Sequence, residues 1–216
     1  MRLLELSLPV LSLAATAAVA APTAINTTQE FKLVTAVKPG QGDKSAFDGL
    51  YLSSYHTGAG KSTVLSTTTL ESCLTVIGMS DATFVSDRTH GVNAFLNETT
   101  SLGPVLQAPA TYPLEFDLGN DFPWSAIVAN VNFYSAWEPV RINGGGFSTE
   151  QGGYYINGTG LQWTTSPNNT RGGDGFGGWI ACTWWHDEPQ LFARVSYYHQ
   201  PTPCNCAEVY LCPEYV

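Results

Sequence analysis

Short segments in which every second residue is apolar constrain the fold of this chain most strongly. In the segment AIVANVNFY, residues 126–134, alternate side chains from Ile127 to Phe133 are apolar. The segments YPLEFDL, residues 112–118, and QLFARVSYY, residues 190–198, alternate in the same way. Successive side chains of a β-strand point to opposite faces, whereas a helix needs apolar residues every three or four positions. These segments therefore predict β-strands with one buried face.

Turn-forming dipeptides separate the predicted strands: Asp48-Gly49, Asn143-Gly144, Asn157-Gly158 and Asp174-Gly175. Further strands are expected at Phe31–Val37, Gly49–Tyr55, Ser62–Thr67, Ala82–Ser86, Tyr154–Asn157, Trp179–Trp185 and Glu208–Tyr215. Ten or more short strands with such turns predict an all-β fold, a single compact β-sandwich or barrel. A β-trefoil is the alternative, although the sequence shows no three convincing internal repeats.

The N-terminus has the pattern of a secretory signal peptide over residues 1–20. A positive charge at Arg2 precedes an apolar run, and small residues at 18–20 offer a cleavage site. Polar residues and a proline interrupt the run, which disfavours a membrane anchor, and no other segment reaches the roughly 20 apolar residues of a membrane span. We expect residues 21–30 to form a flexible segment and residues 31–216 to form a single all-β domain.

Sequons and cysteines agree with an extracellular chain. Four N-x-[ST] patterns predict glycosylation on surface loops: Asn26, Asn97, Asn157 and Asn168. Five cysteines allow at most two intramolecular disulfides. We expect Cys182 to pair with Cys206 or with Cys204, and Cys204 with Cys212 could form a second pair. The protein is expected to be a secreted monomer.

Charge and motifs disfavour several function classes. A formal net charge of −9 disfavours nucleic acid and anionic membranes as partners, because phosphate binding needs clustered Lys and Arg. The stretch YHTGAGKST, residues 55–63, resembles a phosphate-binding loop, but Tyr55 stands where the first glycine is required. The β-branched residues that follow favour a strand over the required helix. We read Thr57–Gly60 as a hairpin turn and expect no cofactor.

Acidic and metal-binding residues provide no strong site. A glycosidase needs two carboxyl groups about 5 to 9.5 Å apart. Four acids could supply such a pair: Glu115, Asp117, Asp121 and Glu138. The alternation instead places Glu115 and Asp117 on a solvated strand face. His186-Asp187-Glu188 are consecutive and rarely converge on one ion, and the cysteines lack CxxC spacing, so we expect no metal.

Aromatic residues are concentrated in the second half of the chain, with six tryptophans between Trp124 and Trp185. Most are expected in a β-core. Trp184 and Trp185 are adjacent, so a strand would point them to opposite faces and leave one half exposed. Exposed aromatic rings stack on sugar rings. The candidate carbohydrate-binding residues are Trp163, Trp184, Trp185, Tyr154 and Tyr155.

A set of blocks in fixed order gives the chain a recognisable relative: FDLGNDFPW, AWEPVRING, FGGWIACTWWHDEPQLF and CAEVYLCPEY. With these blocks, the chain from Phe31 to its C-terminus resembles a family of small secreted proteins of filamentous fungi without an assigned function. More loosely, it is similar to cell-wall proteins of the phialide-development type. The resemblance implies a β-rich extracellular or wall-associated protein and supplies no catalytic residues.

These observations together predict a non-enzymatic, secreted protein of the fungal cell surface or secretome. Contact with wall polysaccharide or glycoprotein is its expected molecular act. A carbohydrate-active hydrolase that uses the paired carboxylates is the first alternative, and a secreted effector is the second.

Overall fold

The computed structural model describes residues 29–56, 79–97, 111–118, 123–129, 135–143, 152–164, 175–183, 189–195 and 200–216. Its strands are β1 (Phe31–Val37), β2 (Tyr51–His56), β3 (Met79–Val85), β4 (Asn93–Leu96), β5 (Leu114–Asp117), β6 (Pro123–Val128), β7 (Trp137–Asn143), β8 (Gly153–Asn157), β9 (Gly160–Thr164), β10 (Phe176–Thr183), β11 (Pro189–Val195) and β12 (Cys206–Tyr215). Helical structure in these residues is limited to two 3₁₀ turns, η1 (Ser45–Phe47) and η2 (Arg88–His90).

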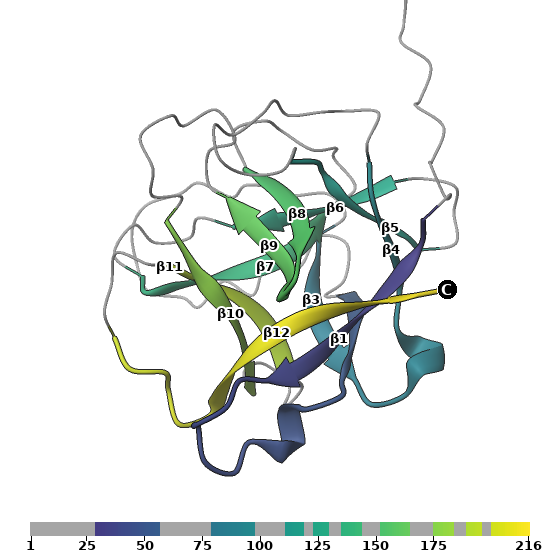
Figure 1. The fold of residues 1–216 in the computed structure, drawn as a ribbon. Coiled ribbons are helices and arrows are strands. Elements are labelled where there is room, and N and C mark those ends of the chain that lie inside the picture. Colours follow the sequence, from purple (N-terminus) through teal and green to yellow (C-terminus); the bar gives the residue numbers. More distant parts are fainter. Residues whose placement is uncertain are drawn as a thin grey trace, which may run out of the picture.

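Ten strands form one antiparallel sheet that closes partly into a ring, and β8 with β9 forms a small second sheet (Figure 1). The all-β prediction is confirmed. β1 has the bounds predicted for it. The predicted strand at Ser62–Thr67 and the turn after His56 lie outside the described residues.

The strand pairs repeat three times along the described chain, in the groups β1–β4, β5–β8 and β9–β12. The second and third strands of each group form an antiparallel pair, namely β2–β3, β6–β7 and β10–β11. The third strands also pair with one another in all three combinations, β3–β7, β7–β11 and β3–β11. Adjacent groups are joined by β4–β5 and β8–β9, and β12–β1 closes the circle.

The first and last strands of each group also meet. Phe31 of β1 pairs with Ala94 of β4, and Tyr112, just before β5, bridges to Tyr154 of β8. In the third group, Gly160 of β9 lies against the backbone of Leu211 in β12. Together these pairings follow the plan of a β-trefoil, the alternative considered above, rather than a two-sheet sandwich.

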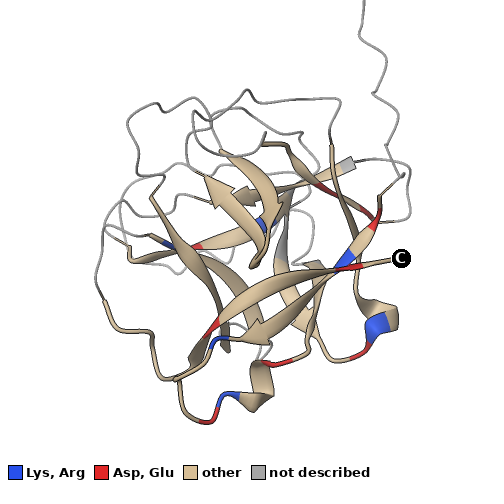
Figure 2. Cartoon of the chain, in the orientation of Figure 1, with Lys and Arg blue, Asp and Glu red and all other residues tan. Residues whose placement is uncertain are grey.

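Charged residues are scattered over the described strands and turns rather than gathered in one patch (Figure 2). Glu208 of β12 forms ion pairs with side chains from two other segments. Arg194 Nη2 lies 3.2 Å from its Oε1, and Lys38 Nζ lies 3.9 Å from its Oε2.

Across these same described residues, no helix has the length and apolar character needed to cross a membrane.

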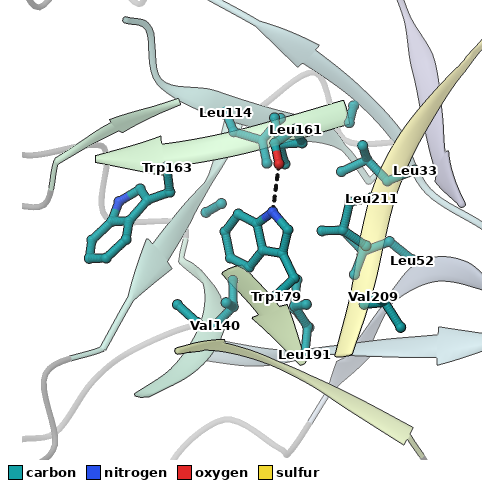
Figure 3. Close-up of a cluster of buried hydrophobic side chains, with 14 of the residues drawn as sticks. Leu33, Leu52, Leu114, Val140, Leu161, Trp163, Trp179, Leu191, Val209 and Leu211 are labelled. Carbon is teal, nitrogen blue, oxygen red and sulfur yellow. Dashed lines mark hydrogen bonds between the residues drawn. The ribbon is translucent and has the colours of Figure 1, made fainter. Parts of the chain in front are cut away.

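The core is filled from all three groups of strands (Figure 3). Leucines and valines surround the indole of Trp179, whose Nε1 donates a 2.6 Å hydrogen bond to the carbonyl oxygen of Leu161. β1 shows how the alternation produces this core, since Phe31 and Leu33 are buried while the side chain between them points outward. An indole N–H that is buried needs such a partner, because an unpaired donor costs free energy.

Some strands are buried on both faces, which the alternation did not predict. Phe95 of β4 pairs with Glu115 of β5, and Glu115 pairs with Ser125 of β6. All three side chains are buried, although they alternate with residues of the main core. The period-two pattern therefore identified the strands but not the solvent exposure of their second face.

One disulfide joins Cys182 of β10 to Cys206 of β12 directly across the strand pair, with a Cα–Cα distance of 4.0 Å. This is the first of the two predicted pairings. It closes a loop with a sequence separation of 24, which corresponds to about 3 kcal/mol of stabilisation in the chain-entropy description.

The predicted second pair, Cys204 with Cys212, is wrong. Both cysteines are free in the structure, with Cys204 exposed and Cys212 half-buried. Cys206 and Cys212 lie six residues apart on the same extended strand β12, which separates their Cα atoms by about 20 Å. Cys204 precedes β12, and a disulfide requires Cα atoms within about 7 Å.

Candidate ligand-binding groove

The predicted aromatic platform is largely part of the core. Tyr154 has an exposed fraction of 0% and Trp163 of 7%. The ring of Tyr154 is stacked parallel to that of Trp179 at a centroid distance of 6.5 Å, and Trp163 meets Phe176 edge-on at 6.0 Å. The prediction that Tyr154 and Trp163 lie on a sugar-binding face is therefore wrong, because burial leaves neither ring with a face open to a sugar.

The other members of the predicted platform have different positions. Tyr155 follows Tyr154 on β8 and points to the opposite side, where it is half-buried. Trp184 and Trp185 lie outside the described residues. The predicted site is thus not assembled by the part of the chain that the structure describes.

Two of the four acids that were predicted to form carboxylate pairs, Glu115 and Glu138, are buried. Glu115 is 7% exposed, so its assignment to a solvated face is wrong. Burial raises the pKa of its carboxyl group, and a 3.1 Å hydrogen bond from Asn97 Nδ2 to Oε2 partly opposes that rise. Glu138 is buried as well, and Asp121 lies outside the described residues.

Strand register separates the two buried acids. Glu115 pairs with Ser125, which pairs with Asn143 of β7. Glu138 lies five residues before Asn143 on the same strand, a distance of about 17 Å along β7. Glu115 and Glu138 are therefore too far apart for the carboxyl separation of about 5 to 9.5 Å that glycoside hydrolysis uses.

An open polar groove of about 550 Å³ is lined by residues of β1, β2, β4 and β5 and of the connections between them. Its described lining comes from these strands and from the turn that contains η2: Lys32, Ser53, Ser54, Thr89, His90, Gly91, Val92, Asn93, Asp117 and Leu118. Hydroxyl, amide, ammonium, imidazole and carboxylate groups therefore share one open concavity.

The η2 turn contributes residues to the lining of this groove and is attached to two strands. The backbone N–H of Val92 donates to the carbonyl oxygen of Leu52 at 3.0 Å, and Ser53 Oγ donates to the carbonyl oxygen of His90 at 3.0 Å. From β1, Lys32 Nζ donates to the carbonyl oxygen of Gly91. These bonds, together with the packing of Val92 against the hydrophobic core, attach the turn to β1 and β2.

The turn itself is stabilised by Asp87. Its Oδ1 accepts 2.8 Å hydrogen bonds from both the backbone N–H and the hydroxyl of Thr89, and these bonds lower the pKa of the Asp87 carboxyl group. Its Oδ2 lies 3.1 Å from His90 Nδ1. Asp87 therefore orients two groove residues, Thr89 and His90, although it does not line the groove.

Gly91 is required where the turn crosses β2. A Cβ at this position would lie 2.8 Å from Cβ of Tyr51, closer than real Cβ atoms approach. Beside this crossing, Tyr51 Oη donates to Glu214 Oε2 at 3.2 Å, and Arg88 Nη2 lies 2.7 Å from Glu214 Oε1. The turn is thereby linked to the end of β12 as well.

Two lining residues of the groove come from one strand pair. Asn93 of β4 lies directly opposite Asp117 of β5 in the antiparallel register. Asn93 Nδ2 donates a 2.9 Å hydrogen bond to Glu30 Oε2, just before β1. A neutral amide and a carboxylate thus stand side by side, as cross-strand neighbours with Cβ atoms about 5 Å apart.

Sequence reasoning did not find this groove. Its lining comes from five separate elements, so no spacing along the chain could bring those residues together. The alternation of β1 does place Lys32 outside the core, but it does not say what Lys32 faces. Within the described residues, no three His, Cys, Asp or Glu side chains gather as a metal site would require.

Comparison with known families identifies the family of this chain. Residues 28–71 and 65–215 match the family described as a domain of unknown function, DUF7907. The chain belongs to the DUF7907 family. No curated protein and no solved structure matches it. Membership in DUF7907 covers nearly all of the described fold and assigns no activity, so the function has to be argued from the site.

Proposed function

We propose that this DUF7907 protein is a secreted, non-enzymatic protein of the fungal cell surface or secretome, and that it binds wall polysaccharide in the groove beside the η2 turn. The observation that carries the proposal is the lining of this groove, in which serine and threonine hydroxyls, an amide, an ammonium and a carboxylate surround one open concavity. Polysaccharides present many hydroxyl groups that both donate and accept hydrogen bonds, and this lining offers both kinds of partner.

The lining also disfavours an apolar ligand. Binding sites for small apolar molecules are mostly lined by hydrophobic and aromatic side chains and enclose most of the ligand. Here the apolar contribution among the described residues is limited to Val92 and Leu118. Recognition would therefore depend on hydrogen bonds rather than on stacking of aromatic rings, which differs from the platform predicted from the sequence.

The same geometry gives little support to a hydrolase. Among the described lining residues, Asp117 is the only carboxylate. Glu115, two residues away, is buried and hydrogen-bonded to Asn97, so it does not reach a bound sugar. A mechanism with paired carboxylates has no second partner in the described part of this groove.

Pull-down of the purified protein on insoluble β-glucan, chitin and mannan tests the proposal. We expect retention on at least one polysaccharide and, for Lys32→Met or Asp117→Asn, a loss of affinity of about tenfold, because a hydrogen bond to a charged group contributes about 1.5 kcal/mol or more. Lys44→Met and Asp43→Asn are matched controls that change the same residue types outside the groove and are expected to bind normally.

Thermal melts of all four variants should accompany the pull-down, so that a misfolded variant is not counted as a binding defect. Retention on none of the polysaccharides would remove the proposed function. Retention that is equally reduced by groove and control substitutions would show that binding takes place elsewhere on the surface.

A further inference from the structure

Two of the four sequon asparagines lie in the described residues, and they differ in solvent exposure. Asn157 is exposed at the turn that connects β8 to β9. Asn97 follows β4 and is only 6% exposed. Asn26 and Asn168 lie outside the described residues. The sequence pattern alone predicted glycosylation at all four asparagines.

Asn157 is held in an open and defined geometry. Its Oδ1 accepts hydrogen bonds from the backbone N–H of Thr159 at 2.9 Å and from the Thr159 hydroxyl at 2.7 Å. Within the described residues no group accepts a hydrogen bond from its Nδ2. A Cβ built on the neighbouring Gly158 meets no atom within 4 Å, so the space around the turn is free.

Asn97 has the opposite surroundings. Its Nδ2 donates a 3.1 Å hydrogen bond to Glu115 Oε2, and both side chains are buried. A sugar attached to Nδ2 would have to displace Glu115 from the outer face of β5. That would deprive the carboxyl group of its hydrogen-bond donor and would require space for a sugar where both side chains are buried.

We propose that Asn157 carries an N-linked glycan in the folded, secreted protein and that Asn97 stays unmodified. In this group transfer, Asn157 Nδ2 attacks the anomeric carbon of an oligosaccharide linked to a lipid pyrophosphate. The bond from that carbon to the pyrophosphate oxygen breaks, the lipid pyrophosphate leaves, and Nδ2 loses one proton. Chains that receive a sugar at Asn97 before folding cannot close the layer around Glu115 and are absent from the folded product.

This inference rests on the secretion part of the proposed function but not on polysaccharide binding. The test therefore uses two forms, the full chain and a version whose residues 1–20 are replaced by the leader of a eukaryotic expression host. The second form enters the secretory pathway regardless of its own leader. Failure of the first form alone would count against the predicted signal peptide and leave the sequon assignment to be decided by the second.

Peptide mapping by mass spectrometry, with and without enzymatic release of N-glycans, gives the readout. We expect a glycan on the Asn157 peptide and none on the Asn97 peptide. Asn157→Gln and Thr159→Ala should each remove one glycan from the intact mass. Thr99→Ala, which destroys the other sequon without changing Asn97, should leave the mass of the attached glycans unchanged. An occupied Asn97, or an unmodified Asn157 in the leader-replaced form, overturns the inference.

Discussion

The contact between β9 and β12 closes the third group of strands, and one glycine permits it. Gly160 begins β9 with φ +104°, and a Cβ there would lie 2.2 Å from the carbonyl oxygen of Leu211. The obstructing atom belongs to the backbone of a central strand, not to the end of a flexible side chain. We therefore expect Gly160→Ala to be strongly destabilising.

The structure gives the magnitude of this effect. A positive φ costs an alanine about 2 kcal/mol. Restoring an ordinary contact of at least 3.4 Å requires β9 to move about 1 Å away from β12. That movement would stretch the 2.6 Å hydrogen bond from Trp179 to the Leu161 carbonyl and loosen the packing around it, which adds about 2 kcal/mol. The expected total is about 4 kcal/mol.

Gly40→Ala is the matched control. Gly40 has φ +86°, close to that of Gly160, but a Cβ there meets no atom within 4 Å. It should cost only the backbone contribution of about 2 kcal/mol. Urea unfolding followed by tryptophan fluorescence measures both free energies of unfolding, and near-UV circular dichroism checks that each variant retains native packing. Equal destabilisation by the two substitutions would refute the close approach of β9 and β12 that completes the third group of strands.

Two further predictions concern buried polar groups. Among the described residues, Tyr154 Oη is buried without a hydrogen-bond partner. We therefore expect Tyr154→Phe to leave the free energy of unfolding unchanged or to raise it by about 1 kcal/mol, and to leave polysaccharide binding unchanged. A loss of binding without a change in stability would favour the aromatic sugar-binding platform predicted from the sequence. Burial raises the pKa of Glu115 above its ordinary value of 4.5. The contribution of Glu115 to the free energy of unfolding of the wild type is therefore fully present below about pH 4.5, and it is lost as the pH rises through the folded-state pKa and the buried carboxyl group ionises. Glu115→Gln keeps an acceptor for Asn97 and should match the wild type in acid but exceed its free energy of unfolding at neutral pH, as measured by urea titrations at several pH values; parallel pH profiles for the two proteins would contradict the burial of Glu115.

Repetition in this fold was hidden from the sequence for a physical reason. Asp48-Gly49 and Asp174-Gly175 precede β2 and β10 in the sequence, and both glycines have φ +69°, so glycines of the same backbone conformation stand at equivalent points of the first and third groups. The second group has no such dipeptide before β6. The connections between strands also differ in length, so no constant period appears. Pairings such as β12 with β1 join residues far apart in the chain, and a linear pattern does not specify them.

Local chemistry determined much of what the sequence could establish: strands from period-two alternation, turns from Asp-Gly and Asn-Gly, and a disulfide between Cys182 and one of two neighbouring cysteines. Only the tertiary structure decided which face of each strand is covered and which distant residues share a surface. It buried Tyr154 and Glu115, which local patterns had placed in contact with solvent, because a closed arrangement of strands covers faces that a single strand would leave open. It also brought Lys32 and Asp117 to one groove, since that neighbourhood depends on how five separate elements pack.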